Sequence, residues 1–274
     1  GSTVTAGTAL VTVSDDAFTT SSATVAATAL SGIGGKTTGA VTVTKAIKIS
    51  GSATQLTDTL VSGGSTVTAG TALVTVSDSA FTTSSAAIAA SALSNIGGKT
   101  SGAVTLQNKV RIQGSQSEVT TALIGDSSVV ASKANTEARV TNAVNASEGD
   151  AIAAVGNVQG IFAGGVSDLL TNLATGSSTK AALNTITGDD SDVSITISDS
   201  GFTTSSATLN ATDLSAVGGA TTGTVTVSNA VKITGSASQL TDTLVTGGST
   251  VTAGTALVTV SDDAFTTSSA TLAA

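Results

Sequence analysis

The sequence lacks six kinds of side chain that carry much of protein chemistry: Cys, His, Met, Pro, Trp and Tyr do not occur among its 274 residues. Without cysteine the chain has no disulfide framework and no thiolate nucleophile or metal ligand. Without histidine it has no side chain that titrates near neutrality, no imidazole ligand and no Ser-His-Asp triad. We therefore expect no enzymatic activity.

Positive charge and long apolar runs are also scarce. Lys and Arg number 10 against 18 Asp and Glu, a formal net charge of -8. Nucleic-acid binding needs clustered Lys and Arg, so we expect no nucleic-acid partner. No run of about 18 apolar residues is present, so we expect no membrane insertion of this segment. The sequence also begins without an initiator Met and without a recognisable signal peptide.

The residues that are present form tandem repeats. The stretch GSTVTAGTALVTVSD begins at Gly1, Gly64 and Gly248, and a Phe-Thr-Thr-Ser-Ser-Ala stretch begins at Phe18, Phe81, Phe202 and Phe265. The first two and the last two of these Phe residues are each 63 positions apart. Self-similarity at a fixed period is typical of stacked repeat architectures. We divide the chain into repeats at 1–63, 64–126, 127–187, 188–247 and 248–274.

The third repeat, 127–187, has diverged from the others. Its marker is GGVSDLLTNL at 164–173, which we align with GSATQLTDTL at 51–60, so that Leu169 corresponds to Leu56. The two ends of the chain, in contrast, match: residues 1–27 and 248–274 differ only at Val25 and Leu272. Because natural arrays usually end in diverged polar caps, we expect a window onto a longer array.

Each repeat contains two similar halves. Val-Thr-Val or close equivalents recur at Val11, Val41, Val74, Val104, Ile195, Val225 and Val258, with the alternation of a half-buried strand. A further short strand is expected at 46–51 and at 230–235. Short helices are expected at 52–61, capped by Ser52 and ended by Gly63 and Gly64, and at 28–33, with Thr212-Asp213 as a cap in the fourth repeat.

The resulting fold class is mainly β with short helices. We favour a repeat solenoid in which each half makes one coil of strand and short helix, two coils per 63-residue unit. Glycines at fixed positions (Gly39, Gly102 and Gly223) are expected to permit the corners. The alternative is beads on a string, each 63-residue unit forming a small α/β domain. A unit that small and poor in aromatics would bury little surface alone.

Acidic residues are the candidates for a metal site. Oxygen ligands close in sequence can hold calcium, and they are densest at Asp189, Asp190 and Asp192. Asp15, Asp78, Asp199 and Asp262 recur after the Val-Thr-Val strands, where an Asp side chain ordinarily caps turn amides. No other cofactor is expected.

Two other groups of polar side chains recur. Lys45 and Lys48 lie on an expected strand, where charges discourage lateral aggregation. Hydroxyl groups in rank on a flat face are a feature of some ice-binding proteins, and Thr12, Thr42 and Thr75 could form such a rank. Single outward Thr residues on a sheet are also the ordinary case.

The stretch LSAVGGATTGTVTVSNAVKITGSASQLTDTLV at 214–245 resembles repeats of giant bacterial cell-surface proteins, common in cyanobacteria, with the pattern DLxxIDxxTTGxVxVxxxxxITGTAxxLxxxL. Residues 28–61 and 91–124 match that pattern too. The resemblance implies secretion, an elongated shape, and roles in adhesins, surface layers, sheaths or matrix filaments. The pattern's Asp is replaced by Gly34, Gly97 and Gly218, which departs from any calcium role of that position.

We therefore expect an extracellular or cell-surface structural protein. The favoured function is a component of a filament, sheath or surface layer that self-associates by stacking repeats. The alternatives are the repetitive stalk of a large adhesin and an ice- or calcium-binding surface protein.

Overall fold

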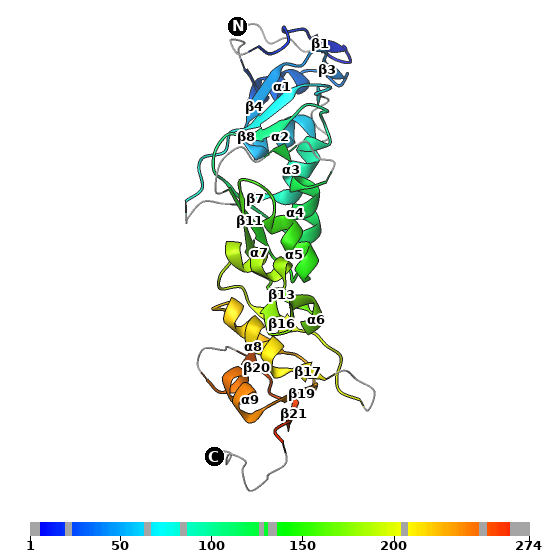
Figure 1. The fold of residues 1–274 in the computed structure, drawn as a ribbon. Coiled ribbons are helices and arrows are strands. Elements are labelled where there is room, and N and C mark those ends of the chain that lie inside the picture. Colours follow the sequence, from blue (N-terminus) through cyan, green and yellow to red (C-terminus); the bar gives the residue numbers. More distant parts are fainter. Residues whose placement is uncertain are drawn as a thin grey trace. The chain divides into compact units, whose positions relative to one another are not determined.

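The computed structural model describes residues 6–19, 24–62, 67–82, 87–125, 129–130, 136–203, 208–246 and 251–263 (Figure 1). The chain divides into two compact units. The first comprises Gly1–Val140 with Val155–Gln159, and the second comprises Thr141–Ala154 with Gly160–Ala274. Strand β12 (Val158–Phe162) begins in one unit and ends in the other.

The strands of the first unit lie in parallel sheets. One sheet has the order β1-β3-β5, and a longer one has the order β10-β8-β6-β4-β2. A further parallel set is β11-β9-β7. Their bounds are β1 (Val11–Val13), β2 (Val25–Ala26), β3 (Val41–Val43), β4 (Lys48–Gly51), β5 (Val67–Thr68), β6 (Leu73–Val76), β7 (Ile88–Ala89), β8 (Val104–Leu106), β9 (Arg111–Gly114), β10 (Val129–Val130) and β11 (Thr136–Val140).

The second unit repeats this arrangement. Two parallel sheets have the orders β13-β16-β18-β20 and β17-β19-β21, and β14 pairs antiparallel with β15. The bounds are β13 (Val166–Asp168), β14 (Ala174–Thr175), β15 (Ser178–Thr179), β16 (Ile195–Ile197), β17 (Leu209–Asn210), β18 (Val225–Val227), β19 (Lys232–Gly235), β20 (Val251–Thr252) and β21 (Leu257–Val260).

Neighbouring strands come from successive halves of the repeats. Val41 pairs with Val11, 30 positions earlier, and Val74 pairs with Ile49, 25 positions earlier. Within the strands, Val41 and Val43 are buried while Thr42 is exposed, as the alternation predicts. The predicted combination of strands with short helices is confirmed, but the class is not mainly β. The fold is mixed α/β, and the sheets of the described residues form no closed barrel.

Short helices follow the strands. In the first unit they are α1 (Ala27–Gly34), α2 (Ala53–Leu60), α3 (Ala90–Gly97) and α4 (Gln116–Leu123), which follow one another along one side of that unit (Figure 1). In the second they are α5 (Ala146–Ala153), α6 (Leu170–Leu173), α7 (Ala181–Asp189), α8 (Ala211–Ala220) and α9 (Ala237–Leu244). Within the described part of the chain, no helix is long and apolar enough to cross a membrane.

The predicted helix at 52–61 is confirmed as α2. Ser52 caps it through the amide of Gln55, whose side chain accepts from the amide of Ser52, a reciprocal capping box. Leu56 and Leu60 are buried on the face that meets the sheet. The same box recurs at the start of α9 with Ser236. The expected end at Gly63 and Gly64 lies outside the described residues.

The predicted helix at 28–33 is confirmed as α1, but the cap predicted for the fourth repeat was wrong. Leu30 is buried, whereas Ile33 is 39% exposed and does not share its environment. In the fourth repeat the cap is not Thr212-Asp213. Helix α8 begins one residue earlier, after Asn210, and the Asp213 carboxylate accepts a hydrogen bond from the amide of Ser177 instead (2.8 Å).

The alignment of the diverged repeat was wrong by four residues. Asp199 accepts from the amide of Leu170 as Asp78 accepts from that of Ala53, so Leu170 occupies the place of Ala53. Leu173, which is fully buried, therefore takes the place of Leu56. Leu169 stands before the helix and is 42% exposed. The alignment had matched Gly164-Gly165 with Gly51-Ser52, and this similarity placed the rest of the segment in the wrong register.

The corner glycines are required because the preceding half-unit passes close to each of them. A Cβ at Gly39 would lie 2.4 Å from the carbonyl oxygen of Ala9, and one at Gly102 would lie 2.3 Å from that of Ala72. At Gly223 the corresponding oxygen, that of Val193, would be 2.5 Å away, and the oxygen of Asp192 would be 2.2 Å away. The preceding half-unit passes so close that no side chain fits, and close backbone approach, not left-handed conformation, demands glycine.

Candidate functional site

The most regular polar feature is a threonine that joins each Thr-Thr-Gly or Thr-Ser-Gly motif to the preceding half-unit. The Thr37 hydroxyl donates to the carbonyl of Ala9 (2.6 Å), that of Thr100 to Ala72 (2.6 Å), and that of Thr221 to Val193 (2.7 Å). All three Thr residues are at most 9% exposed. We call these contacts threonine bridges.

Each threonine bridge also organises its own corner. The hydroxyl oxygen of Thr100 accepts a hydrogen bond from the amide of Gly102 (3.0 Å), and Thr37 and Thr221 do the same for Gly39 and Gly223. One side chain thus satisfies a backbone acceptor of one half-unit and a donor of the next. Buried backbone groups that lack partners are costly, so the motif fixes how far apart the two half-units lie.

Aspartates make a second set of contacts between half-units. The carboxylate of Asp78 accepts from the amide of Ala53 (2.6 Å), the first residue of α2, 25 positions earlier. Asp262 does the same for α9, Asp199 for α6 and Asp168 for α5. We call these contacts aspartate caps. A negative charge at a helix N-terminus is favourable because free amides and the helix dipole meet there.

The sequence correctly indicated that Asp78, Asp199 and Asp262 bind amides, but not which amides. A cap was expected in the local turn, yet the donors belong to the helix of the previous half-unit. Helix starts and recurring Asp residues are both visible in the sequence. Their fixed separation, 25 positions from Ala53 to Asp78 and from Ala237 to Asp262, was the signal that could have linked them.

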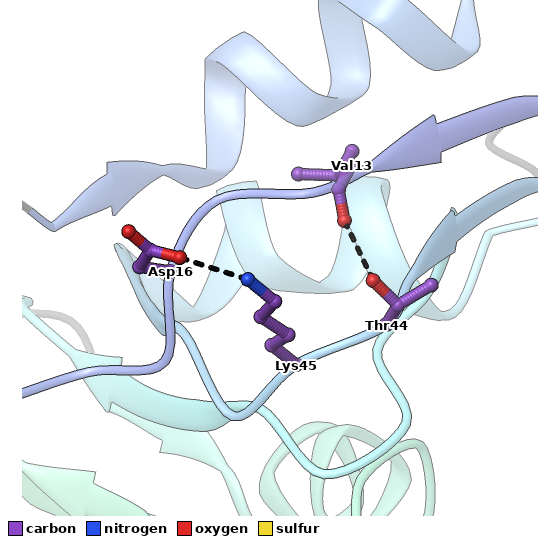
Figure 2. A network of polar contacts seen from close by, with 4 residues as sticks. All are labelled: Val13, Asp16, Thr44 and Lys45. Atoms are coloured by element: carbon purple, nitrogen blue, oxygen red, sulfur yellow. Dashed lines mark hydrogen bonds and ion pairs between the residues drawn. The ribbon is translucent and has the colours of Figure 1, made fainter.

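Charged residues near β1 form an exposed contact between strand ends. The Lys45 ammonium lies 2.8 Å from the Asp16 carboxylate, and the Thr44 hydroxyl donates to the carbonyl of Val13 at 3.3 Å. Figure 2 shows the two contacts near each other. The hydrogen bond from Lys45, and then its charge, lower the pKa of Asp16. An exposed pair of this kind adds little stability. The structure gives Lys45 this carboxylate partner, whereas the sequence predicted only a charge that discourages lateral aggregation.

Phenylalanine and a cation meet across half-units, a contact that the sequence interpretation missed. The Lys48 ammonium lies 5.2 Å from the centre of the Phe18 ring, and the Lys232 ammonium lies 5.8 Å from that of Phe202. The Arg111 guanidinium lies 4.0 Å from the Phe81 ring. Each pair is 30 positions apart, which was the available signal. Cations within about 6 Å of an aromatic face are attracted by its quadrupole.

The three residues predicted to hold calcium follow α7 or end it. Asp189 accepts from the amide of Gly160 and Asp190 from that of Phe162, both at 2.7 Å, while Asp192 is exposed. Calcium takes 6–8 oxygen ligands. Within the described ranges, no three acidic side chains gather closely enough to hold a metal ion. The carboxylates of Asp189 and Asp190 therefore accept hydrogen bonds from the backbone of β12. Calcium binding by these residues stays a prediction.

The predicted threonine rank exists in part. Thr12 lies beside Thr42, and Thr42 beside Thr68, on adjacent parallel strands. The inclusion of Thr75 was wrong, because Thr75 lies in the longer sheet between Ser50 and Thr105. The repeats place equivalent strands in different sheets, which equal spacing along the chain does not indicate.

These contacts are all between one half-unit and the next, and no acid–base or nucleophile pair emerges from them. Among known proteins, no family model, no curated protein and no solved structure matches this chain.

Proposed function

We propose that this protein is a structural component of an extracellular filament, sheath or surface layer, built by stacking half-units into a solenoid, with no catalytic role. The observation that carries the proposal is the recurrence of two junctions. A parallel ladder and a threonine bridge join the two halves of a repeat, and a parallel ladder and an aspartate cap join one repeat to the next. An element that bonds in the same way to the copy before it and the copy after it is suited to indefinite addition.

The longer sheet of the first unit favours a solenoid over separate beads. Its strands run from β2 at Val25 to β10 at Val130 and so include strands of both the first and second 63-residue repeats. Ser50 of the first repeat pairs with Thr75 of the second. Helix α2 likewise packs against α3 as well as α1. The repeat boundary at 63/64 therefore does not separate two cores.

The cross-half-unit contacts also explain how a core this thin can be stable. The buried side chains of the first unit are mainly Val, Leu, Ile and Ala. A single half-unit with one short helix would not hold its shape alone, since short helices need tertiary packing. Each added neighbour contributes hydrogen bonds worth about 1 kcal/mol apiece together with apolar burial. We therefore expect the free energy of unfolding to increase with the number of stacked half-units.

The surface location rests on the resemblance of 28–61, 91–124 and 214–245 to repeats of bacterial surface proteins. Electron microscopy of the purified chain over a range of concentrations tests the function. Ordered fibres whose length grows with concentration are the expected result. Isolated rods at every concentration would favour the adhesin stalk instead, and separate compact particles would contradict both.

A further inference from the structure

A groove of about 710 Å³ lies on the face of the longer sheet that is turned away from the helices. Side chains from β4, β6 and β8 line it, with Phe18 and Gln107 among the flanking residues. Its volume lies within the range of about 300 to 1,000 Å³ typical of sites for small ligands. All of its lining residues belong to the first unit and none belongs to a threonine bridge or aspartate cap.

Its floor is a rank of hydroxyl groups set by the strand register. Ser50, Thr75 and Thr105 are neighbours on three successive parallel strands. Such strands lie about 4.8 Å apart. No hydrogen bond within the described part of the chain engages these three hydroxyls. Thr75, the middle one of the three, is 9% exposed and lines the groove.

One cation stands beside that floor. Lys48 lies on the same face as Ser50, two positions before it, with its ammonium against the Phe18 ring. The ion pairs of the described residues are Lys45–Asp16 and Arg111–Glu137, so Lys48 has no carboxylate partner among them. The lining contains no acidic residue. The lining of the groove therefore carries a positive charge, although the net charge of the chain is -8.

The equivalent place in the next repeat has different chemistry. Arg111 replaces Lys48 and is neutralised by Glu137, with contacts of 2.6 and 3.1 Å. The places of Ser50 and Thr75 are taken there by Gln113 and Arg139.

The fourth repeat keeps the chemistry of the groove. Lys232 lies against Phe202 without a carboxylate partner among the described residues, and Thr234 pairs with Thr259 on the neighbouring strand. The unpaired ammonium beside a row of hydroxyls is therefore lost in the second repeat and present in the first and fourth.

We propose that this groove binds an acidic oligosaccharide. A sugar chain presents hydroxyls that pair with Ser50, Thr75, Thr105 and Gln107, and apolar ring faces that pack on Phe18. Lys48 supplies a charge-assisted hydrogen bond to a carboxylate, which selects an acidic sugar over a neutral one. A nucleic acid would need several clustered cations, and one is present. The proposal does not rest on filament formation.

The test is calorimetric titration of the dilute, full-length chain with tetragalacturonic acid at about 0.1 M salt, using the fully methyl-esterified tetramer as the uncharged twin. The acid is expected to bind saturably and the ester about tenfold more weakly. Lys48→Met should weaken binding of the acid about tenfold, and Thr75→Val about threefold. Lys99→Met, an exposed Lys of the same unit outside the groove, should leave it unchanged.

Each variant is checked by far-ultraviolet circular dichroism, so a loss of folding is distinguished from a loss of contact. The proposal is overturned if the folded wild-type chain binds neither tetramer, or if it binds acid and ester equally. If Lys48→Met and Lys99→Met weakened binding equally, the attraction would come from the overall charge of the chain and not from the groove. That result would also overturn the proposal.

Discussion

The threonine bridge at Thr100 offers the sharpest test of how the half-units are joined. Replacing Thr100 with valine keeps the shape and the β-branch but removes the hydroxyl that donates to Ala72 (2.6 Å) and accepts from Gly102 (3.0 Å). A buried hydrogen bond contributes about 0.5–1.5 kcal/mol, and a partner left unsatisfied costs more. The two bonds together predict a loss of about 2 kcal/mol in the free energy of unfolding.

The matched control is Thr42→Val, the same exchange at an exposed strand position. It should change the free energy of unfolding by less than about 0.5 kcal/mol. Urea unfolding followed by circular dichroism measures both, with the change taken from the midpoint at constant slope. A Thr100→Val variant as stable as Thr42→Val would refute the view that these hydroxyls join the half-units.

Three further outcomes follow from the same contacts. Gly102→Ala places a Cβ 2.3 Å from the Ala72 oxygen and should destabilise the chain by about 2 kcal/mol or more, whereas Gly98→Ala, whose Cβ would meet nothing closer than 3.5 Å, should be near neutral by urea unfolding. Because Lys45 lowers the pKa of Asp16, their pairing is fully present above the ordinary carboxyl pKa and is lost only as pH falls through the lower pKa of the folded state. A carbon-detected NMR titration should show the Asp16 midpoint rising in Lys45→Met, and an unmoved midpoint would contradict the pair. With Asp189 and Asp190 bound to backbone amides, replacing a chelator with millimolar calcium should change the melting temperature by less than about 1 °C, and a larger rise would support the calcium site.

Local patterns predicted the elements well. The alternation of Val41, Thr42 and Val43 led to a strand, and Ser52 marked the start of α2, because these signals depend on residues a few positions apart. The same reasoning failed in the diverged repeat. There, α6 is four residues long and the correct register depends on which amide Asp199 reaches, a contact 29 positions away.

The candidate sites were less predictable, since they depend on which strands become neighbours. Phe18 was noted only as part of a repeated stretch and Lys48 only as a charge on a strand, although the fold brings them together. Thr75 was placed with Thr12 and Thr42, yet it lies between Ser50 and Thr105. The groove follows from that lateral register, which the period of the repeats does not determine because equivalent strands join different sheets.

Continuity across the repeat boundary is the central claim, and one distance measures it directly. Because the chain has no cysteine, Ser50→Cys and Thr75→Cys together allow a single pair of spin labels on β4 and β6, one in each of the first two repeats. Adjacent parallel strands lie about 4.8 Å apart, so the labelled pair should show strong dipolar broadening relative to the sum of the two single-labelled chains. A spectrum equal to that sum would show that the two repeats fold as separate beads and would contradict the account.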